Sequence, residues 1–549
     1  MGNQKTVMLT PARTSWMTAI AATLLIVLVS MDLFMMPVAT SALVKAFNTN
    51  AGMVQGAISL FALLLAAMTI LGGKLGDILG KKKVFMLGVG LYGVAAAVTA
   101  LAPIPLVLIV GFSLIRSVAV ALAVPASVAL IIAGYANEGQ RGQAFAIYGV
   151  GAMTAGLVAP LLMGFMADKV SWRVPFGLEV LIVLVAVVLS RQITETPKVK
   201  TQVDGIGTVL AFLSFGAIVL GGMLGGPYGW WNLRRPFEIA GMTLNPLNLS
   251  PAALLFAIGG VGIVLLTSHI TRREDRKMPA LFSMKLFDNR TYAVTTLMVV
   301  VFFLLNGALP FVVPVFLQEA VEFDGSKTGM VMAVFMIGAL IASLSSGGLL
   351  VRLQPRLLMQ VALLVIVAGF FWLSSVVSPR LGVLTVALPM FVVGLGFGTV
   401  FAQVPNIQLS GLPDALQGEG SGLAETCKGV GVGLGTSLIG SVMFGLALGA
   451  MVDTVALQTQ VELSPKERAT LILQIEDDTV PQEVEQFVTE KVPNLKEIMQ
   501  AAYVQAFQTT LGVLTGIVLL ALIVASFIPS LQTENDRKEK RVDPGGNAS

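Results

Sequence analysis

The sequence predicts an all-helical protein that crosses a membrane fourteen times, and three observations support this fold class. Of 549 residues, 55% are hydrophobic and only 12% are charged, with a mean hydropathy of +0.85. Soluble domains carry roughly twice that charged fraction, so a single soluble core cannot bury this much apolar surface. Apolar runs of about 20 residues recur along the chain, and Lys and Arg gather in the short segments between them.

Each apolar run is long enough to cross the hydrocarbon core of a bilayer as one helix. The first run lacks a small-residue cleavage site, so we expect it to remain as a membrane helix. The fourteen runs lie at about 17–44, 51–72, 84–102, 106–134, 143–167, 174–191, 205–226, 251–270, 292–319, 328–351, 358–377, 383–410, 421–449 and 505–529.

The basic residues predict the orientation, because short cytoplasmic loops carry an excess of Lys and Arg. With the N-terminus inside, most loop cations fall on the cytoplasmic side, and an even number of helices places both termini there. We therefore expect a multi-pass protein of the plasma membrane (the inner membrane of a two-membrane cell), surrounded by lipid. The cations assigned to that side include Lys74, Lys81, Lys82, Lys83, Arg141, Arg191, Lys198, Lys200, Arg272, Arg273, Arg276, Lys277, Lys285, Arg290, Arg352 and Arg356.

Composition excludes several function classes. The net charge of +4 resides in these loops and does not indicate a nucleic-acid partner. One cysteine and one histidine, far apart, argue against a disulfide, a zinc site or an enzyme. The sequence contains no Gly-x4-Gly-Lys-Ser/Thr loop, so ATP-driven transport is not supported. A membrane sensor would need a large soluble output domain, and the sequence does not indicate one. We expect a monomer that binds no cofactor and uses the proton gradient as its source of energy.

A short basic loop, 72–83, is echoed by 347–356, with Asp77 of the first copy corresponding to Arg352 of the second. This repeat predicts two six-helix bundles with two extra helices inserted between them. The expected domains are 1–195 (first bundle), 196–290 (insert and basic linker), 291–535 (second bundle) and 536–549 (cytoplasmic tail).

The longest outer loop, 450–504, is acidic and is expected to be partly helical at 464–476 and 481–491. It is either a solvated hairpin without direct chemistry, or a cap over an outward exit that concentrates cations there.

Two charges fall deep inside predicted helices, where a charge is costly and therefore a candidate for function. Asp32 lies about fifteen residues, or about 22 Å, from the cytoplasmic end of its helix, and Arg116 lies at a similar depth. Either this pair only holds the bundle together, or Asp32 takes up and releases a proton while Arg116 tunes its proton affinity.

Two further carboxylates are proton-coupling candidates. Glu179, five residues into its helix, is either a third candidate of this kind or only interfacial and close to Arg173. Glu425 either forms a local ion pair with Lys428, three residues on, or attracts a cationic solute or a proton. The lone His269 is expected to be solvated at the interface.

Polar residues and methionines inside the helices predict an adaptable substrate cavity, since Met suits promiscuous apolar binding. The alternative is that the methionines only pack or face lipid. Interior prolines (Pro37, Pro160, Pro314 and Pro405) free backbone carbonyls, which is tolerated mainly beside a cavity or partner. The expected lining residues are Phe34, Met35, Met36, Tyr148, Met153, Asn306, Gln403 and Asn406.

The loop 72–83 resembles the motif G-x-L-x-D-x-x-G-K-K-K, which lies between helices 2 and 3 of the major facilitator superfamily; the alternative is a generic basic turn. The residues that carry this conformational motif are Gly73, Asp77, Gly80, Lys81 and Lys82, with Arg352 in the second copy.

Over about 17–530 the chain resembles the fourteen-helix drug:proton antiporter branch of that superfamily. Asp32 stands as in the branch's L-D-x-T-I-V-N-V-A motif, and Arg116 as in R-x-x-Q-G. The segment with Gly156, Pro160 and Gly164 resembles the antiporter motif G-P-x-x-G-G. The departures from the branch are Phe34, Pro37, Ala119, Val120, Ala159, Met163, Glu179, Glu425 and Lys428.

The resemblance implies export of amphipathic, often cationic small molecules, driven by proton influx through alternating access. The loss of the intact Gly-Pro signature weakens the antiporter assignment, and the extra carboxylates favour cationic substrates. The alternative within transport is a lipid or lipid-like amphiphile transporter of the same fold.

Overall fold

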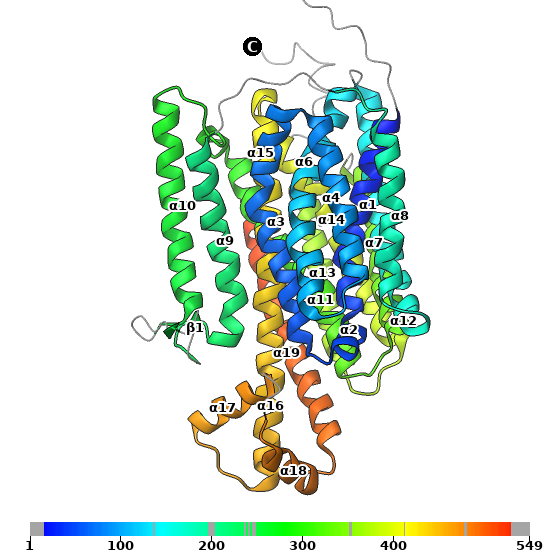
Figure 1. Ribbon diagram of the computed structural model, residues 1–549, viewed down its shortest axis with the longest axis vertical. Helices are drawn as coiled ribbons and strands as arrows, with labels where there is room; N and C mark the ends of the chain where they lie inside the picture. The colour runs from blue at the N-terminus through cyan, green and yellow to red at the C-terminus, as the bar shows by residue number, and fades with distance from the viewer. Residues whose placement is uncertain are drawn as a thin grey trace, which may run out of the picture.

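The computed structural model describes residues 16–135, 138–195, 204–234, 238–239, 242–243, 249–350, 354–410, 412–476 and 480–528. Within these ranges fourteen helices are long and apolar enough to cross a membrane, so the predicted fold class is confirmed. Most predicted boundaries agree with the observed helices to within a few residues, and the last two helices extend furthest beyond them. The long helices run side by side in one bundle (Figure 1).

The first half of the chain supplies six spanning helices. Its elements are α1 (Trp16–Val38), α2 (Thr40–Phe47), α3 (Ala51–Leu79), α4 (Lys81–Ala100), α5 (Pro105–Ile109), the π-helical segment η1 (Val110–Ile115), α6 (Arg116–Gly134), α7 (Glu138–Lys169) and α8 (Arg173–Ser190).

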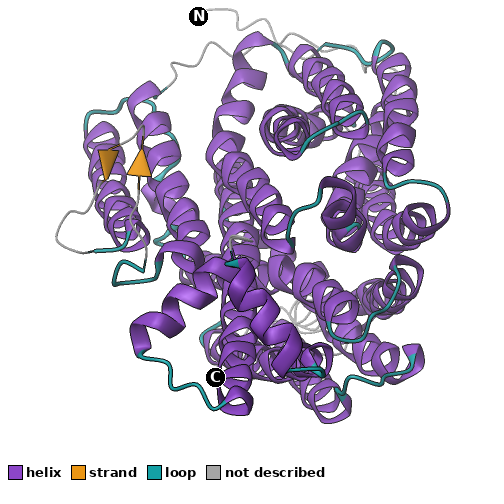
Figure 2. Ribbon diagram, turned by 60° about the horizontal axis from the view of Figure 1, so that its bottom comes forward, coloured by secondary structure: helices purple, strands orange, loops and turns teal. Residues whose placement is uncertain are grey.

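The two inserted helices stand at one side of the bundle (Figure 1). They are α9 (Gly205–Tyr228) and α10 (Pro251–Asp275), and α9 packs against α3 while α10 packs against α9. Two short antiparallel strands, β1 (Glu238–Ile239) and β2 (Met242–Thr243), lie in the connection between them (Figure 2) and were not predicted. The predicted domain boundary at 195/196 stays a prediction, because residues 196–203 lie outside the described chain.

The second half supplies the other six spanning helices. Its elements are the short helix η3 (Met284–Leu286), α11 (Arg290–Glu319), α12 (Gly325–Leu350), α13 (Pro355–Val376), α14 (Val383–Ser410), α15 (Asp414–Leu434), the π-helical segment η4 (Gly435–Ile439), α16 (Gly440–Thr459), α17 (Pro465–Glu476), α18 (Gln482–Lys491) and α19 (Leu495–Ser526).

The two ends of the bundle differ in the residues and helices that they carry. The basic face carries Lys81–Lys83, Arg191 and Arg272–Arg273, at the ends where α4 begins and where α8 and α10 finish. The opposite face carries α17 and α18, which lie beyond the bundle where α16 and α19 extend past it (Figure 1). These two short helices confirm the prediction of helices at 464–476 and 481–491.

The two halves pack closely against each other where α7 meets α12. A Cβ at Gly164 would collide with the carbonyl oxygen of Gly325, and a Cβ at Gly329 would collide with that of Pro160. Asp168 then accepts hydrogen bonds from the backbone N–H groups of Gly325 and Ser326, at 3.1 and 2.7 Å, at the start of α12. Glycine and a capping carboxylate therefore bring the two helices together near the opposite face.

Candidate functional site: a buried charge cluster beside a central cavity

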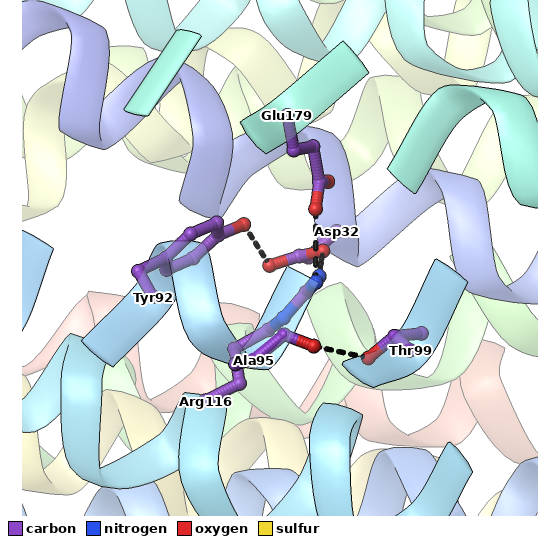
Figure 3. Close-up of polar contacts among 6 residues, drawn as sticks. All are labelled: Asp32, Tyr92, Ala95, Thr99, Arg116 and Glu179. Atoms are coloured by element: carbon purple, nitrogen blue, oxygen red, sulfur yellow. Dashed lines mark hydrogen bonds and ion pairs between the residues drawn. The ribbon is translucent and has the colours of Figure 1, made fainter. Parts of the chain in front are cut away.

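Asp32, Tyr92, Arg116 and Glu179 form a charge cluster inside the first half of the protein (Figure 3). The Arg116 guanidinium donates through Nη1 to Asp32 and through Nη2 to Glu179 Oε2, the latter at 2.9 Å. The Tyr92 hydroxyl donates to the second carboxylate oxygen of Asp32. Four helices (α1, α4, α6 and α8) thus meet at one guanidinium.

The cluster is sealed from solvent. Arg116 and Glu179 are 0% exposed and Asp32 is 2% exposed. The Arg116 guanidinium also lies over three aromatic rings, with its Cζ 4.8 Å from the ring centre of Tyr92, 5.2 Å from that of Phe112 and 5.5 Å from that of Phe176. Such contacts favour a desolvated cation, so this pocket is built for a buried guanidinium.

The backbone before Arg116 is unusual. α5 passes into the π-helical segment η1, which ends at Ile115, and Arg116 begins α6. A π-helical turn holds an extra residue and shifts the faces of the helix that follows, and such turns are frequent at functional sites. Ser113, within η1, donates at 2.7 Å to the carbonyl of Ala57 in α3, which ties the segment to its neighbour.

Charge is not balanced in the cluster if every group is ionised, because it contains two carboxylates and one guanidinium. Among the described residues, Glu179 Oε1 and Arg116 Nε have no hydrogen-bond partner. An unpaired charge in a dry interior is costly. The arrangement is therefore suited to hold one proton on its carboxylates, in addition to the proton of the guanidinium.

Glu179 is buried against Arg116 and is not interfacial, while its role in proton coupling stays a prediction. Arg173, the expected interfacial partner, donates instead to the carbonyl of Ala102 at 2.8 Å and lies over the Trp172 ring. Tyr92 was missed by the sequence reasoning. Its only signal was a polar hydroxyl in an otherwise apolar run, 84–102, and the protein has six tyrosines in all.

A cavity of about 250 Å³ lies between the two halves. The first half contributes residues of α1, α3, α6 and α7, and the second half contributes residues of α11, α12, α14 and α15. Of the predicted lining residues, Phe34, Met153 and Asn306 are on its wall. Aromatic rings of Phe61, Phe303, Phe397 and Phe401 make much of the remaining surface.

Glu425 and Lys428 bring charge to this otherwise apolar wall. Their side chains form the predicted i,i+3 ion pair, with 2.6 Å between Lys428 Nζ and Glu425 Oε1. Glu425 nevertheless remains 44% exposed, so its carboxylate is accessible from the cavity or solvent. The local pair and an interaction with solute are therefore compatible.

Several predicted lining residues lie elsewhere. Met35 and Met36 are completely buried in the core, as the packing alternative expected. Gln403 is buried and donates to the Ser346 hydroxyl at 2.8 Å. Tyr148 packs against the small cluster around Ala19 and Tyr135. The side chain of Asn406 lies outside the described part of the chain.

α1 separates the charge cluster from the cavity. Ser30, Leu33 and Phe34 face the cavity, whereas Asp32 does not line it and contacts Tyr92 and Arg116 on the other side. The two features therefore share a helix without sharing a surface.

The motif loop connects α3 and α4 through Gly80, whose φ of +107° is a conformation that favours glycine. Lys82 donates from its backbone N–H to Glu195 at 3.0 Å and from Nζ to the carbonyl of Arg191 at 2.8 Å. The loop is therefore bound to the end of α8 within the same half. Gly73 and Lys81 lie in α3 and α4, whereas the Asp77 side chain and Arg352 lie outside the described residues.

Toward the opposite face, two glutamines join the halves. Gln55 Nε2 donates to the carbonyls of Thr436 and Ser437, both at 3.1 Å, in the π-helical segment η4. Gln318 accepts from the backbone of Ser41 at 2.9 Å and donates to the carbonyl of Val38 at 3.0 Å. A π-helical turn leaves carbonyls without regular partners, and the Gln55 amide satisfies them.

One expectation about the insert is wrong. His269 is not simply solvated, because its Nε2 lies 2.9 Å from Asp204 Oδ1 and its side chain is 20% exposed. Asp204 also caps α9 by accepting from the Gly207 N–H at 2.9 Å. This contact fastens the two inserted helices together at the basic face.

Comparisons with known proteins agree with this architecture. A family model described as the Major Facilitator Superfamily matches residues 22–436. The tetracenomycin C resistance and export protein of Streptomyces glaucescens is 24% identical over 542 residues, covering 97% of this chain and 95% of that protein. The multidrug export protein EmrB of Haemophilus influenzae is 24% identical over 365 residues, covering 65% of this chain and 67% of that protein.

Solved structures support the fold. A bacterial homologue of the human lysosomal transporter Spinster has a TM-score of 0.59 at 14% identity, covering 93% of this chain and 97% of that one. A D-xylose–proton symporter has a TM-score of 0.55 at 13% identity, covering 87% and 98%.

Proposed function

Because this chain belongs to the Major Facilitator Superfamily, we propose that it is a proton-coupled secondary transporter that exports amphipathic or cationic compounds by alternating access. The observation that carries the proton coupling is the buried cluster of two carboxylates around one guanidinium. The export direction and the substrate class rest on the relatives, one named as a tetracenomycin C resistance and export protein and one as a multidrug export protein.

The central cavity is the proposed substrate site. Its wall combines aromatic rings with one acidic and one basic side chain, Glu425 and Lys428, and Asn306 adds a polar group. Apolar pockets with a few convergent polar groups are typical of small-molecule sites. Glu425, the more exposed member of the ion pair, would attract the cationic end of a substrate.

The proposed coupling runs through α1. Substrate in the cavity contacts Leu33 and Phe34, and a displacement of α1 changes the contacts of Asp32 with Arg116 and Tyr92 on its other face. Loss of those contacts lets the proton held by the two carboxylates leave to the side then open. Glu179 and Asp32 both form an ion pair with Arg116. When one carboxylate is protonated, the other keeps its ion pair with the guanidinium.

The contacts between the halves support an alternating mechanism. Gln55 and Gln318 join the halves toward the opposite face, and α7 meets α12 there. These contacts would separate when the protein opens to that face. By the excess of Lys and Arg, we assign the basic face to the cytoplasm, with both termini on that side.

A lipid or lipid-like amphiphile is the second candidate substrate. The observation in its favour is the cavity wall, which is largely aromatic and aliphatic. Such a wall accepts acyl chains as readily as an apolar drug, and the paired Glu425 and Lys428 could then contact a zwitterionic head group.

The test uses proteoliposomes with an imposed pH gradient. Lumenal pH is followed on addition of tetraphenylphosphonium, a lipophilic cation, with wild type beside Asp32→Asn and a control, Asp453→Asn, at an exposed carboxylate. We expect the cation to trigger proton movement in wild type and control, and Asp32→Asn to lose it. Wild-type proton movement by folded Asp32→Asn would contradict the role of Asp32. If no cation moves protons through folded wild type, the lipid alternative is favoured.

A further inference from the structure

A second cavity, of about 510 Å³, lies at the opposite face. It is bounded by α3, α9, α11, α16 and α19, and α17 contributes Ile472 and Ile475 to its wall. It shares no lining residue with the central cavity. The outer segment 450–504, for which a cap was one of two alternatives, thus contributes to a second cavity, to which the proposed transport cycle assigns no substrate.

Glu319 is the one carboxylate on the wall of this second cavity, among the described residues. It is the last residue of α11, it is partly buried, and no described residue forms an ion pair or hydrogen bond with its side chain. The neighbouring cation, Lys496, is already paired with Glu322 at 2.6 Å, and Gln500 also donates to Glu322 at 3.1 Å. Glu319 is therefore left to face the cavity.

The packing of α11 on α19 fixes where Glu319 lies. The rings of Phe316 and Phe507 are stacked, with centres 4.0 Å apart and an angle of 6° between their planes. The two helices run in opposite directions, so Glu319 and Tyr503 each lie about one turn beyond that stack toward the opposite face. Both residues line the cavity. A rigid aromatic contact thus presents a carboxylate beside a phenol ring.

The rest of the wall combines apolar side chains with polar ones, the latter from Thr49, Asn50, Gln55, Ser59 and Ser441. Three methionines contribute to it, and methionine side chains adjust to ligands of different shape. Arg234, the basic lining residue, comes from the connection after α9 and is exposed. The apolar lining residues include Val44, Met223, Phe444, Leu448, Met451, Ile472, Ile475 and Met499.

We propose that this cavity is a second binding site, which takes an amphiphile with a cationic head group. Glu319 contacts the head group, Tyr503 offers its ring and hydroxyl, and the methionines with Ile472 and Ile475 of α17 cover the apolar body. A partly desolvated carboxylate without an ion-pair partner, in a cavity that also carries methionine and isoleucine side chains, favours this combination of charge and hydrophobicity. The proposal concerns binding and does not depend on proton coupling.

The experiment is a protection assay on the full-length protein. Cys427, the one native cysteine, is replaced by Ala, and a single reporter is introduced as Ile475→Cys. A maleimide dye labels the reporter in the presence of increasing tetraphenylphosphonium. Labelling of a second reporter, Val461→Cys, which precedes α17 and does not line the cavity, serves as the control for indirect effects.

We expect tetraphenylphosphonium to protect Ile475→Cys and to leave Val461→Cys unchanged. Glu319→Gln should raise the concentration needed for protection by roughly tenfold or more, as expected when a charged contact is lost. Glu322→Gln is the matched control, three residues away, and should change it little. Asp32→Asn should retain protection even if transport is lost.

Unaltered protection in Glu319→Gln would overturn the proposal, and so would equal loss in Glu322→Gln and Glu319→Gln. Protection by the anionic amphiphile dodecyl phosphate instead of the cation, lost in Arg234→Gln, would also overturn it, since Arg234 would then select the ligand. Folding of each variant is checked by size-exclusion chromatography, and Glu319→Asp, which keeps the charge, should restore binding at least in part.

Discussion

α1 and α11 are the first spanning helices of the two halves, and their buried faces differ in charge. α1 presents Asp32 to Tyr92 and Arg116 in a dry interior. α11 is buried over 83% of its most apolar stretch, and it has no charged residue between Arg290 and Glu319. Its interior contacts are uncharged and include aromatic pairs, with Phe302 4.6 Å from Phe397 between ring centres.

This difference indicates that the two halves have different roles. Buried charge in the first half gives a group whose protonation can change with conformation, and it costs stability that neighbouring groups must offset. Aromatic packing in the second half gives a wall that binds apolar solutes, and the Glu425–Lys428 ion pair on that wall is assigned to substrate charge rather than to the transported proton. We infer that proton chemistry belongs to the first half and that the second half mainly shapes the cavity.

The largest effect is expected from Arg116→Ala. It leaves two buried carboxylates without their cation, so we expect a loss of about 3–5 kcal/mol of stability, or no folded protein. Thermal unfolding of the purified protein measures this, with Arg173→Ala, which removes a cation nearer the helix end, as the milder control. A stable and active Arg116→Ala protein would refute the charge cluster as a linked unit.

An intermediate effect is expected from Glu179→Gln. If the cluster holds one proton, a neutral amide resembles the protonated acid, so stability should change by no more than about 1 kcal/mol. Proton release on binding of tetraphenylphosphonium, followed with a pH dye in weak buffer, should nevertheless fall. Full proton release by this variant would exclude Glu179 from the coupling and leave Asp32 as the sole carrier.

The smallest effect on proton coupling is expected from Phe303→Leu in the second half. Phe303 lines the cavity and its ring lies 5.4 Å from Lys428 Nζ. The substitution removes aromatic surface, so binding of the cation should weaken by a factor of roughly five to ten. Protons moved per cation should stay as in wild type. A changed proton-to-cation ratio would break the proposed division between the halves.

Much of the fold could be predicted because membrane helices have a simple requirement, about 20 apolar residues without charge. The depth of Asp32 and Arg116 followed from counting along each helix. Depth does not say which face of the helix a side chain occupies, and Glu179, only a few residues into α8, was for that reason compatible with either the interface or the interior.

The residues that line the cavity were predicted less accurately than the helices, for a related reason. A helix that is apolar on every face carries no periodic signal to show which face meets the cavity. Met35 and Met36 therefore looked like Phe34 in the sequence, yet only Phe34 reaches the cavity wall. Tyr92 was missed because its partner, Asp32, lies 60 residues away in the chain.

The central claim is that the cluster around Arg116 carries a proton that substrate binding displaces. Infrared difference spectroscopy tests it most directly, by recording the protonated-carboxyl band of wild type before and after tetraphenylphosphonium binds. We predict that this band decreases on binding, that the decrease is absent in Asp32→Asn or Glu179→Gln, and that it persists in Glu425→Gln. A decrease that persists in both cluster variants and vanishes in Glu425→Gln would place the proton in the cavity and contradict the account.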